Sequence, residues 1–441
     1  MKKSLYLYAF VAALGGLLFG FDTAVINGAL PFLREYFQLT EAMEGWAISS
    51  AILGCVIGAL FIGRPGDIFG RRFMLKIIAL LYLVSAIGSG LADNITTFIV
   101  YRIIGGIAVG GASVLSPTYI SEITPAKYRG RFTITFQMAI VIGILLAFFS
   151  DYLLIGIGEN NWRWMFIAEV LPAGLFFVML FFVARSPRWL VKSGKIEEAK
   201  VTIEKLNSEA NSDELIEEIR QSIDEKVVNS LKSIFKKPYL KLLYLGIFLG
   251  VTNQLTGINI IMYYSTDIFR EAGFSTESGI AQTVVIGATN LLFTILAMMV
   301  IDKIGRKKML LSGALGMSVF LGLFAHAFIT NIGGYILLGY LVCFVAFFAF
   351  SHGAVIWVLF SEMFPNNIRA RGVSISSFSS WTANALTIFL FPIIARTYTN
   401  GIGYLFVFYA IATFISFFIF KKHIVETKGK TLEALEKEVL K

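Results

Sequence analysis

The sequence predicts an all-α membrane protein with twelve transmembrane helices, arranged as two pseudo-symmetric six-helix bundles joined by a short helical linker. Three observations support this prediction. Of 441 residues, 56% are hydrophobic and only 15% are charged, which is too apolar for an ordinary soluble protein. The chain contains twelve apolar runs that are long enough to cross a bilayer. Two charged motifs occur once in each half, which indicates an internal repeat.

The apolar runs follow one another with short polar connections, except after the sixth. The predicted spans are 5–30, 44–64, 73–92, 97–121, 131–155, 164–184, 240–269, 279–301, 308–329, 334–361, 372–396 and 402–421. With the N-terminus placed inside, only four of the 38 Lys and Arg fall on outer segments, namely Arg34, Arg163, Arg270 and Arg396, and Arg102 falls within a span. Because basic residues concentrate in cytoplasmic segments, both termini are predicted to be cytoplasmic.

The polar segments define the expected domains. Residues 1–184 are predicted to form the N-terminal six-helix bundle and residues 240–421 the C-terminal six-helix bundle. Residues 185–239 are predicted to be a cytoplasmic helical linker, because 196–206 and 215–228 have the spacing of short amphipathic helices. Residues 422–441 are expected to form a cytoplasmic tail.

Several other classes of protein are disfavoured. The net charge of +9 would suit nucleic-acid binding, but the basic residues are distributed over the predicted cytoplasmic loops, so no nucleic-acid partner is expected. Cys55 and Cys343 lie in apolar runs and are interpreted as core residues, not as a disulfide or a metal site. The sequence offers no recognisable nucleophile–base pair, metal cluster or phosphate loop, so we expect neither an enzyme nor a bound metal or cofactor.

Two loop motifs recur at matching positions in the two halves. Asp67–Arg72 (D-I-F-G-R-R) corresponds to Asp302–Lys307 (D-K-I-G-R-K), and Glu122–Gly130 (E-I-T-P-A-K-Y-R-G) to Glu362–Arg369 (E-M-F-P-N-N-I-R), with offsets of 235 and 240 residues. Acids and arginines at neighbouring helix ends can pair across a closed cytoplasmic face. The predicted cytoplasmic gate consists of Asp67, Arg71, Glu122, Arg129, Asp302, Arg306, Glu362 and Arg369. The alternative is that these charges only set the topology and cap helix ends.

Together with three further segments, these motifs resemble the sugar porter family of the major facilitator superfamily. The segments are Ser186–Leu190 (S-P-R-W-L), Gln254–Asn259 (Q-L-T-G-I-N) and Glu426–Glu433 (E-T-K-G-K-T-L-E). The resemblance covers about residues 5–438 and is most similar in pattern to bacterial xylose–proton symporters. It implies the major facilitator fold and a secondary active transporter that imports a monosaccharide, a pentose or a hexose, with protons by alternating access. It also implies a cofactor-free monomer in the inner membrane of a bacterium, driven by the proton gradient.

The chain departs from the family pattern in two motifs. The usual P-E-S-P-R is here Ala184–Arg188 (A-R-S-P-R), so that Arg185 replaces an acid. The usual I-R-G is Ile368–Ala370 (I-R-A).

A carboxylate, Asp22, lies deep within the first apolar run, where an ionised Asp costs roughly 2.5–3.5 kcal/mol. Only two other charged residues, Arg102 and Glu169, are identified as lying clearly within predicted spans. At about 1.5 Å per residue from the span ends, all three reach a similar depth in the outer part of the first bundle. Asp22 is expected to stay ionised beside Arg102, and to take up a proton when Arg102 moves toward Glu169. We interpret the three as a proton-coupling site; the alternative is a static buried salt bridge.

A sugar site needs side chains that both donate and accept hydrogen bonds, and an aromatic surface for the C–H face of the ring. The predicted substrate-binding residues are Gln137, Asn253, Gln254, Asn259, Asn290, Asn384, Trp357, Trp381, Phe19 and Tyr263. By resemblance, the family's sugar-binding positions correspond to Gln137, Gln254, Asn259, Asn290 and Trp357. Gly257 predicts local unwinding, because an ideal helix would point Gln254 and Asn259 about 140° apart.

Other functions remain open from the sequence. A facilitator that moves sugar without protons is disfavoured by Asp22, because related facilitators tend to have a neutral Asn at this place. An inositol or polyol–proton symporter would use the same kind of amides. A non-transporting sugar receptor would usually need a long signalling tail, and drug export fits so many amides poorly.

Overall fold

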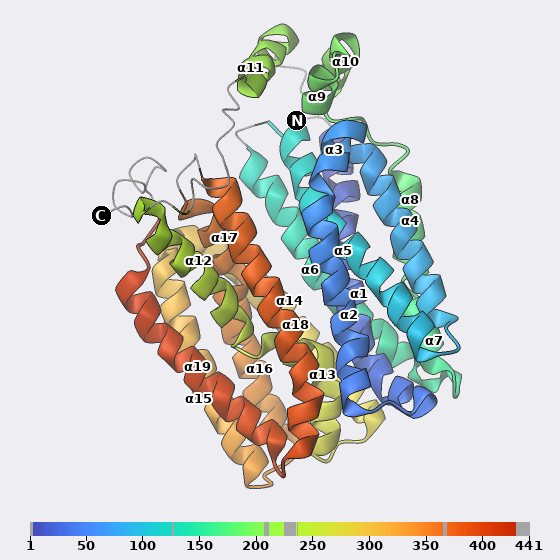
Figure 1. Ribbon diagram of the computed structural model, residues 1–441, viewed down its shortest axis with the longest axis vertical. Coiled ribbons are helices and arrows are strands. Elements are labelled where there is room, and N and C mark those ends of the chain that lie inside the picture. The colour runs from blue at the N-terminus through green and yellow to red at the C-terminus, as the bar shows by residue number, and fades with distance from the viewer. Residues whose placement is uncertain are drawn as a thin grey trace. The chain divides into compact units, whose positions relative to one another are not determined.

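The computed structural model describes residues 3–125, 128–206, 211–224, 235, 237–364 and 368–428, and over these residues its regular structure is helical, without a strand (Figure 1). The helices are α1 (Lys3–Phe37), α2 (Glu41–Phe61), α3 (Gly63–Phe69), α4 (Arg71–Gly90), α5 (Ile95–Ile123), α6 (Arg129–Leu154), the short η2 (Ile155–Ile157), α7 (Asn161–Ile167), α8 (Val170–Met179), α9 (Pro187–Lys192), α10 (Ile196–Leu206), α11 (Ser212–Asp224), α12 (Lys237–Gln254), α13 (Ile258–Glu271), α14 (Thr276–Ile304), α15 (Arg306–Ile329), α16 (Tyr335–Phe350), α17 (His352–Glu362), α18 (Arg369–Thr397) and α19 (Gly401–His423).

Among the described residues, 12 helical segments are long and apolar enough to cross a membrane. They correspond one to one with the predicted spans, so the predicted all-α, multi-pass fold is confirmed. Three spans consist of two consecutive helices, namely α7 with α8, α12 with α13, and α16 with α17. At the junction between the two helices of each pair, the regular main-chain hydrogen bonding of the span is interrupted. Main-chain N–H and C=O groups at the junction can therefore bond to other partners.

The break between α12 and α13 is the one that the sequence predicts. Gly257 adopts a left-handed backbone conformation with φ of +79°, and a Cβ at this position would lie 2.7 Å from the ring of Tyr409. Both the conformation and the available space therefore require glycine. The breaks at Glu169 and Ser351 were not predicted, although Pro172 cannot donate a main-chain hydrogen bond to Ala168 and so interrupts the helix next to Glu169.

Small residues allow the helices of the first half to approach closely. A Cβ on Gly58 of α2 would overlap with the main-chain carbonyl of Ile107 in α5, and one on Gly110 would overlap with that of Cys55. Packing of small residues is a major source of association between membrane helices. Gly105 of α5 extends this pattern, since its Cβ would lie 3.1 Å from Asp22 Oδ1. The glycines thus bring α5 to the acid on α1.

Contacts divide the described chain into two units, one of residues 3–29 and 50–224 and the other of residues 30–49 and 235–428. The predicted bundle boundaries near 184 and 240 stay a prediction, and the described part of the tail ends at residue 428. The end of α1 and the beginning of α2 group with the second unit. This grouping reflects ion pairs and close packing, such as Gly45 against the main-chain carbonyl of Phe389.

The linker forms helices α9 to α11 at the end of the first unit where α1 begins (Figure 1). Ser4 Oγ donates a 2.7 Å hydrogen bond to the main-chain oxygen of Lys205, which connects α10 to the start of α1. Helix α10 has the predicted bounds, and α11 begins slightly earlier than predicted; residues 225–228 of that predicted helix lie outside the described residues. Helix α9 was not predicted; it begins with Ser186 Oγ accepting from the Trp189 amide.

Candidate functional site

Asp22 of α1 and Arg102 of α5 form a buried ion pair. Arg102 Nη1 donates to Asp22 Oδ1 at 2.7 Å, and Nη2 donates to the main-chain oxygen of Asp22 at 3.2 Å. The two side chains are 3% and 1% exposed, respectively. The ring of Phe166 lies 5.5 Å from the guanidinium carbon. A charge pair this deeply buried is sensitive to the loss of either partner.

Glu169 is a second buried acid near this pair. It lies in the break between α7 and α8, is 1% exposed, and interacts electrostatically with both Asp22 and Arg102. Within the described part of the chain, Glu169 Oε1 and Arg102 Nε have no hydrogen-bond partner. The guanidinium is therefore bonded to one of two buried acids. Such an arrangement permits Arg102 to exchange partners if α1, α5 and α7 move relative to one another.

Two further buried polar groups of the same unit were not predicted from the sequence. Asp151 of α6 is a further acid inside a predicted span, so the set of three charged residues within spans was incomplete. Its side chain is fully buried against Gly28, and neither carboxylate oxygen has a hydrogen-bond partner among the described residues. Tyr82 of α4 is also fully buried; its hydroxyl has no hydrogen-bond partner in the described part of the chain, and it interacts electrostatically with Asp22 and Glu169. The position of Asp151 inside the run 131–155 was a signal that could have identified it.

Three amide side chains of the predicted sugar site meet in the second unit. Asn259 Nδ2 donates to Gln254 Oε1 at 2.5 Å and to Asn384 Oδ1 at 2.9 Å. Gln254 Nε2 donates to Ser380 Oγ at 2.8 Å, so Ser380 joins the group although it was not among the predicted site residues. The break at Gly257 brings Gln254 and Asn259 together despite their separation on an ideal helix. Their mutual hydrogen bonds satisfy groups that a hydroxylated ligand could also satisfy.

The other predicted sugar-site residues occupy varied environments. Asn253 is 5% exposed and its Oδ1 has no partner among the described residues, while Asn290 is 7% exposed. Trp357 is 40% exposed, with an edge-on contact to Phe360 at 5.5 Å between ring centres. Trp381 is half-buried and Tyr263 is buried, both in the second unit. Gln137 and Phe19 are half-buried and belong to the first unit.

The two repeated loop motifs form equivalent ion pairs. In the first unit, Arg71 pairs with Asp67 at 2.6 Å and with Glu122 at 3.0 Å, and Ser186 Oγ donates to Glu122 at 2.5 Å. Burial acts to raise the pKa of Asp67, but the Arg71 guanidinium and the Lys192 ammonium outweigh it and hold that pKa below its ordinary value. Asp67 therefore stays charged at neutral pH, and we call Arg71, Asp67 and Glu122 the Arg71 triad.

The second unit repeats this arrangement. Arg306 pairs with Asp302 at 2.9 Å and with Glu362 at 3.1 Å, and Thr427 Oγ1 donates to Glu362 at 2.5 Å. The two predicted gate residues Arg129 and Arg369 have side chains outside the described ones. The repeat is thus present in the ion pairs as well as in the sequence.

A second ion cluster, not predicted from the sequence, connects α1 and α2 to α13 and α18. Arg34 Nε donates to Glu44 at 2.7 Å, and another of its nitrogens contacts Asp267. Arg396 also pairs with Glu44, at 3.1 Å, and Glu44 is only 1% exposed. Three of the four arginines assigned to outer segments, Arg34, Arg270 and Arg396, line one pocket of about 500 Å³ here. The acids Glu44 and Asp267 supply the counter-charges of these three arginines.

Replacing Glu44 by Gln is expected to lower the thermal stability of the purified protein. The change removes the carboxylate shared by Arg34 and Arg396, and the loss of one partner of a buried charge group typically costs about 3–5 kcal/mol. Thermal unfolding in detergent measures the effect. The matched control is Glu41→Gln, an exposed acid of the same first turn, expected to change stability by less than about 0.5 kcal/mol. Equal melting temperatures for the two variants would contradict the importance of the cluster.

Comparisons with known proteins agree with this architecture. A family model described as "Sugar (and other) transporter" matches residues 8–439. The chain is 37% identical to the arabinose-proton symporter of Bacillus subtilis over 433 residues, covering 97% of this chain and 93% of the relative. It is also 37% identical to the D-xylose-proton symporter of Escherichia coli over 464 residues, covering 97% and 94%.

A solved structure of the xylose transporter XylE from E. coli, in an inward open conformation, is similar to this chain with a TM-score of 0.88. The sequence identity is 35%, and the similarity covers 98% of this chain and 99% of that chain. Sequence and fold therefore agree over nearly the full length, and the resemblance predicted from the motifs is confirmed.

Proposed function

The chain belongs to the sugar (and other) transporter family, and we propose that it imports a monosaccharide together with protons by alternating access. The observation that carries this proposal is the buried Asp22–Arg102 pair with the second acid Glu169 beside it. The names of the relatives, which include arabinose-proton and D-xylose-proton symporters, support the same function.

In the proposed coupling cycle, one guanidinium serves two acids. While Arg102 is bonded to Asp22, the carboxylate keeps its negative charge, because an opposite charge at hydrogen-bond distance favours the ionised form. When Arg102 moves toward Glu169, Asp22 is left in apolar surroundings and binds a proton on its carboxylate. One charge moving through 100 mV supplies about 2.3 kcal/mol, which is enough for roughly fifty-fold accumulation of a sugar.

The proposed sugar site uses the amides on both sides of the α12–α13 break. Gln254, Asn259 and Asn384 supply donors and acceptors in one place, and these groups now bond to one another. A sugar that enters would replace these bonds with bonds to its hydroxyl groups, so the exchange costs little. Asn253 and Asn290 are further amides in this unit, and Trp357 and Trp381 are aromatic surfaces available for the ring.

The remaining assignments follow from the charge distribution and the family. We assign both termini and the helices α9 to α11 to the cytoplasmic side of a bacterial inner membrane, and the Arg71 and Arg306 triads to the cytoplasmic gate. The ion cluster around Glu44 then lies on the outer side. The protein is proposed to act as a carrier without enzymatic activity or cofactor, and as a monomer.

A transport screen tests the function directly. Purified protein in lipid vesicles with an imposed pH gradient is offered radiolabelled pentoses, hexoses and inositols. We expect concentrative uptake of a pentose or a hexose, accompanied by alkalinisation of the outer medium. Uptake that only equilibrates the sugar would instead identify a uniporter, and selective accumulation of inositol would identify a polyol symporter. Binding without flux would identify a receptor.

Trp357→Ala is expected to weaken sugar binding by roughly two- to tenfold, the range typical of a lost aromatic contact. The indole is 40% exposed and makes an edge-on contact with Phe360 of the same helix, so its removal should disturb the fold little. Titration calorimetry with the sugar identified by the screen measures the change. Phe378→Ala, another exposed aromatic residue of the second unit, is the control. An unchanged affinity for Trp357→Ala would remove this residue from the site.

A further inference from the structure

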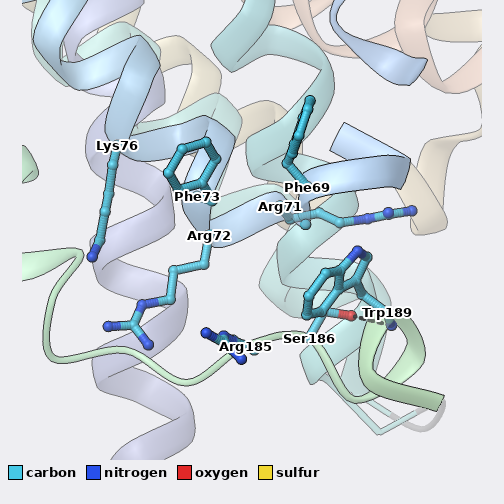
Figure 2. Close-up of a pocket in the computed structure, with 9 residues that line it drawn as sticks. Phe69, Arg71, Arg72, Phe73, Lys76, Arg185, Ser186 and Trp189 are labelled. Carbon is cyan, nitrogen blue, oxygen red and sulfur yellow. Dashed lines mark hydrogen bonds between the residues drawn. The ribbon is translucent and has the colours of Figure 1, made fainter. Parts of the chain in front are cut away.

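A basic pocket lies in the first unit where α3 ends and α4 begins (Figure 2). It has a volume of about 300 Å³ and its lining includes four cationic side chains, Arg71, Arg72, Lys76 and Arg185, and no acidic one. Figure 2 shows Arg72 and Lys76 extending toward the segment before α9, which carries Arg185, whereas Arg71 points away from them. The pocket is not part of the proposed sugar or proton site.

The four cations differ in how far nearby acids neutralise them. Arg71 is balanced by Asp67 and Glu122 in the triad described above. Arg72 donates instead to neutral acceptors, the main-chain oxygens of Leu180 and Phe181, at 3.0 and 2.8 Å. These bonds hold the guanidinium in place without neutralising it.

Lys76 and Arg185 are also weakly compensated. Lys76 Nζ lies 3.4 Å from the centre of the Phe181 ring and interacts electrostatically with the like charges of Arg72 and Arg185. Arg185 pairs with Glu198 at 3.2 Å, but the two side chains are 43% and 46% exposed. Ion pairs exposed to this degree contribute little to stability. Among the described residues, the solvent-exposed Glu198 is thus the one acid that pairs with any of these three cations, an arrangement that favours an anion from outside the chain.

The sequence explains why the described residues supply so little counter-charge to Arg72, Lys76 and Arg185. In the P-E-S-P-R motif that the segment resembles, an acid occupies the position of Arg185. The replacement changes the charge at this position from −1 to +1. The first turn of α4 adds to the positive potential of the pocket. It contains no acid, and its N-cap, Gly70, has no side chain that could accept a hydrogen bond from the free main-chain amides.

Exposed aromatic side chains flank the pocket. Phe69 and Phe73, which line it, are 57% and 52% exposed, and Phe181 next to Lys76 is 52% exposed. Cations beside exposed apolar side chains match the boundary between lipid headgroups and acyl chains. This boundary is where a phosphate group can reach Arg72 and Lys76 while the attached chains contact the phenylalanines.

We propose that this pocket binds a phosphate oxyanion through Arg72, Lys76 and Arg185, as carried by the headgroup of an anionic phospholipid or by free phosphate. The guanidinium groups suit the oxygens of a phosphate, and the ammonium adds a point charge. The bound phosphate takes the place of the acid that the family motif has at position 185.

The test compares an anionic phospholipid with free phosphate as ligands of the purified full-length protein in neutral detergent, with a zwitterionic phospholipid as the control. Phosphatidylglycerol, phosphatidylcholine and inorganic phosphate are each titrated while the thermal unfolding temperature is recorded, since a ligand that binds the folded state raises it. We expect phosphatidylglycerol to raise the unfolding temperature and phosphatidylcholine to have no such effect. A rise with inorganic phosphate as well would identify the free anion as a ligand of the same site.

Arg185→Glu restores the acid of the family motif and is expected to weaken phosphate binding by about 30-fold, because two units of charge are lost. Arg220→Glu on α11 makes the same change of charge outside the pocket and is expected to leave the affinity within about twofold. Lys76→Gln provides a second variant, with an expected loss of about fivefold. Binding of neither source, or equal losses in Arg185→Glu and Arg220→Glu, would overturn the proposal.

Discussion

Vesicles that contain the Asp22→Asn variant are expected to exchange the transported sugar but not to accumulate it. Asn has nearly the same shape as Asp and keeps an oxygen that can accept from Arg102, so the packing of α1 against α5 should survive. It cannot bind and release a proton between pH 5 and 8. The pH gradient then cannot drive transport, because the variant has no group at this position that takes up and releases the coupled proton. The roughly fifty-fold accumulation expected for the wild type is lost, and the sugar only reaches equal concentrations on the two sides of the membrane.

Two assays on the same vesicles separate coupling from transport. Counterflow of labelled against unlabelled sugar measures exchange, and uptake under an imposed pH gradient measures accumulation. Asp151→Asn is the matched control, because Asp151 is a fully buried carboxylate of the same unit without an ion pair among the described residues. This control is expected to accumulate sugar as the wild type does. Wild-type accumulation by Asp22→Asn would refute the coupling role of Asp22.

The spans were predictable because an apolar run is directly visible in the sequence and must be about as long as the bilayer is thick. The backbone breaks were less predictable. Gly257 indicated one, since glycine tolerates the left-handed conformation that it adopts here. Ser351 gave no such signal, whereas the break at Glu169 lies just before Pro172, which has no amide hydrogen to bond to the carbonyl of Ala168.

The proton-coupling site was partly predictable because the sequence also gives the depth of each residue within its span. Counting residues along a helix gives depth, and depth alone placed Asp22 and Arg102 at the same level, where the structure pairs them. Depth does not give rotation about the helix axis, so it could not show that Glu44 bonds to Arg34 and Arg396. It also could not show that Trp357 is 40% exposed. Such contacts depend on how each helix is turned against its neighbours.

Arg102→Met is expected to be the most destabilising of the single substitutions considered. Met fills similar space but leaves the Asp22 carboxylate buried without its guanidinium, and breaking a buried ion pair from one side typically costs about 3–5 kcal/mol. The cost should decrease at low pH, because a protonated carboxyl no longer carries an unpaired charge. Thermal unfolding of the purified variant at neutral and acidic pH measures both effects.

The double variant Asp22→Asn/Arg102→Met isolates the pairing energy. Neither of its two residues is charged, so we expect it to recover most of the stability that Arg102→Met loses, and to show little of the pH dependence. The four proteins of this double-mutant cycle give the interaction energy directly. If the two substitutions destabilise additively, Asp22 and Arg102 do not depend on each other, and a guanidinium that moves between two acids cannot be the basis of coupling. A large, pH-dependent interaction energy is what the proposed proton switch requires.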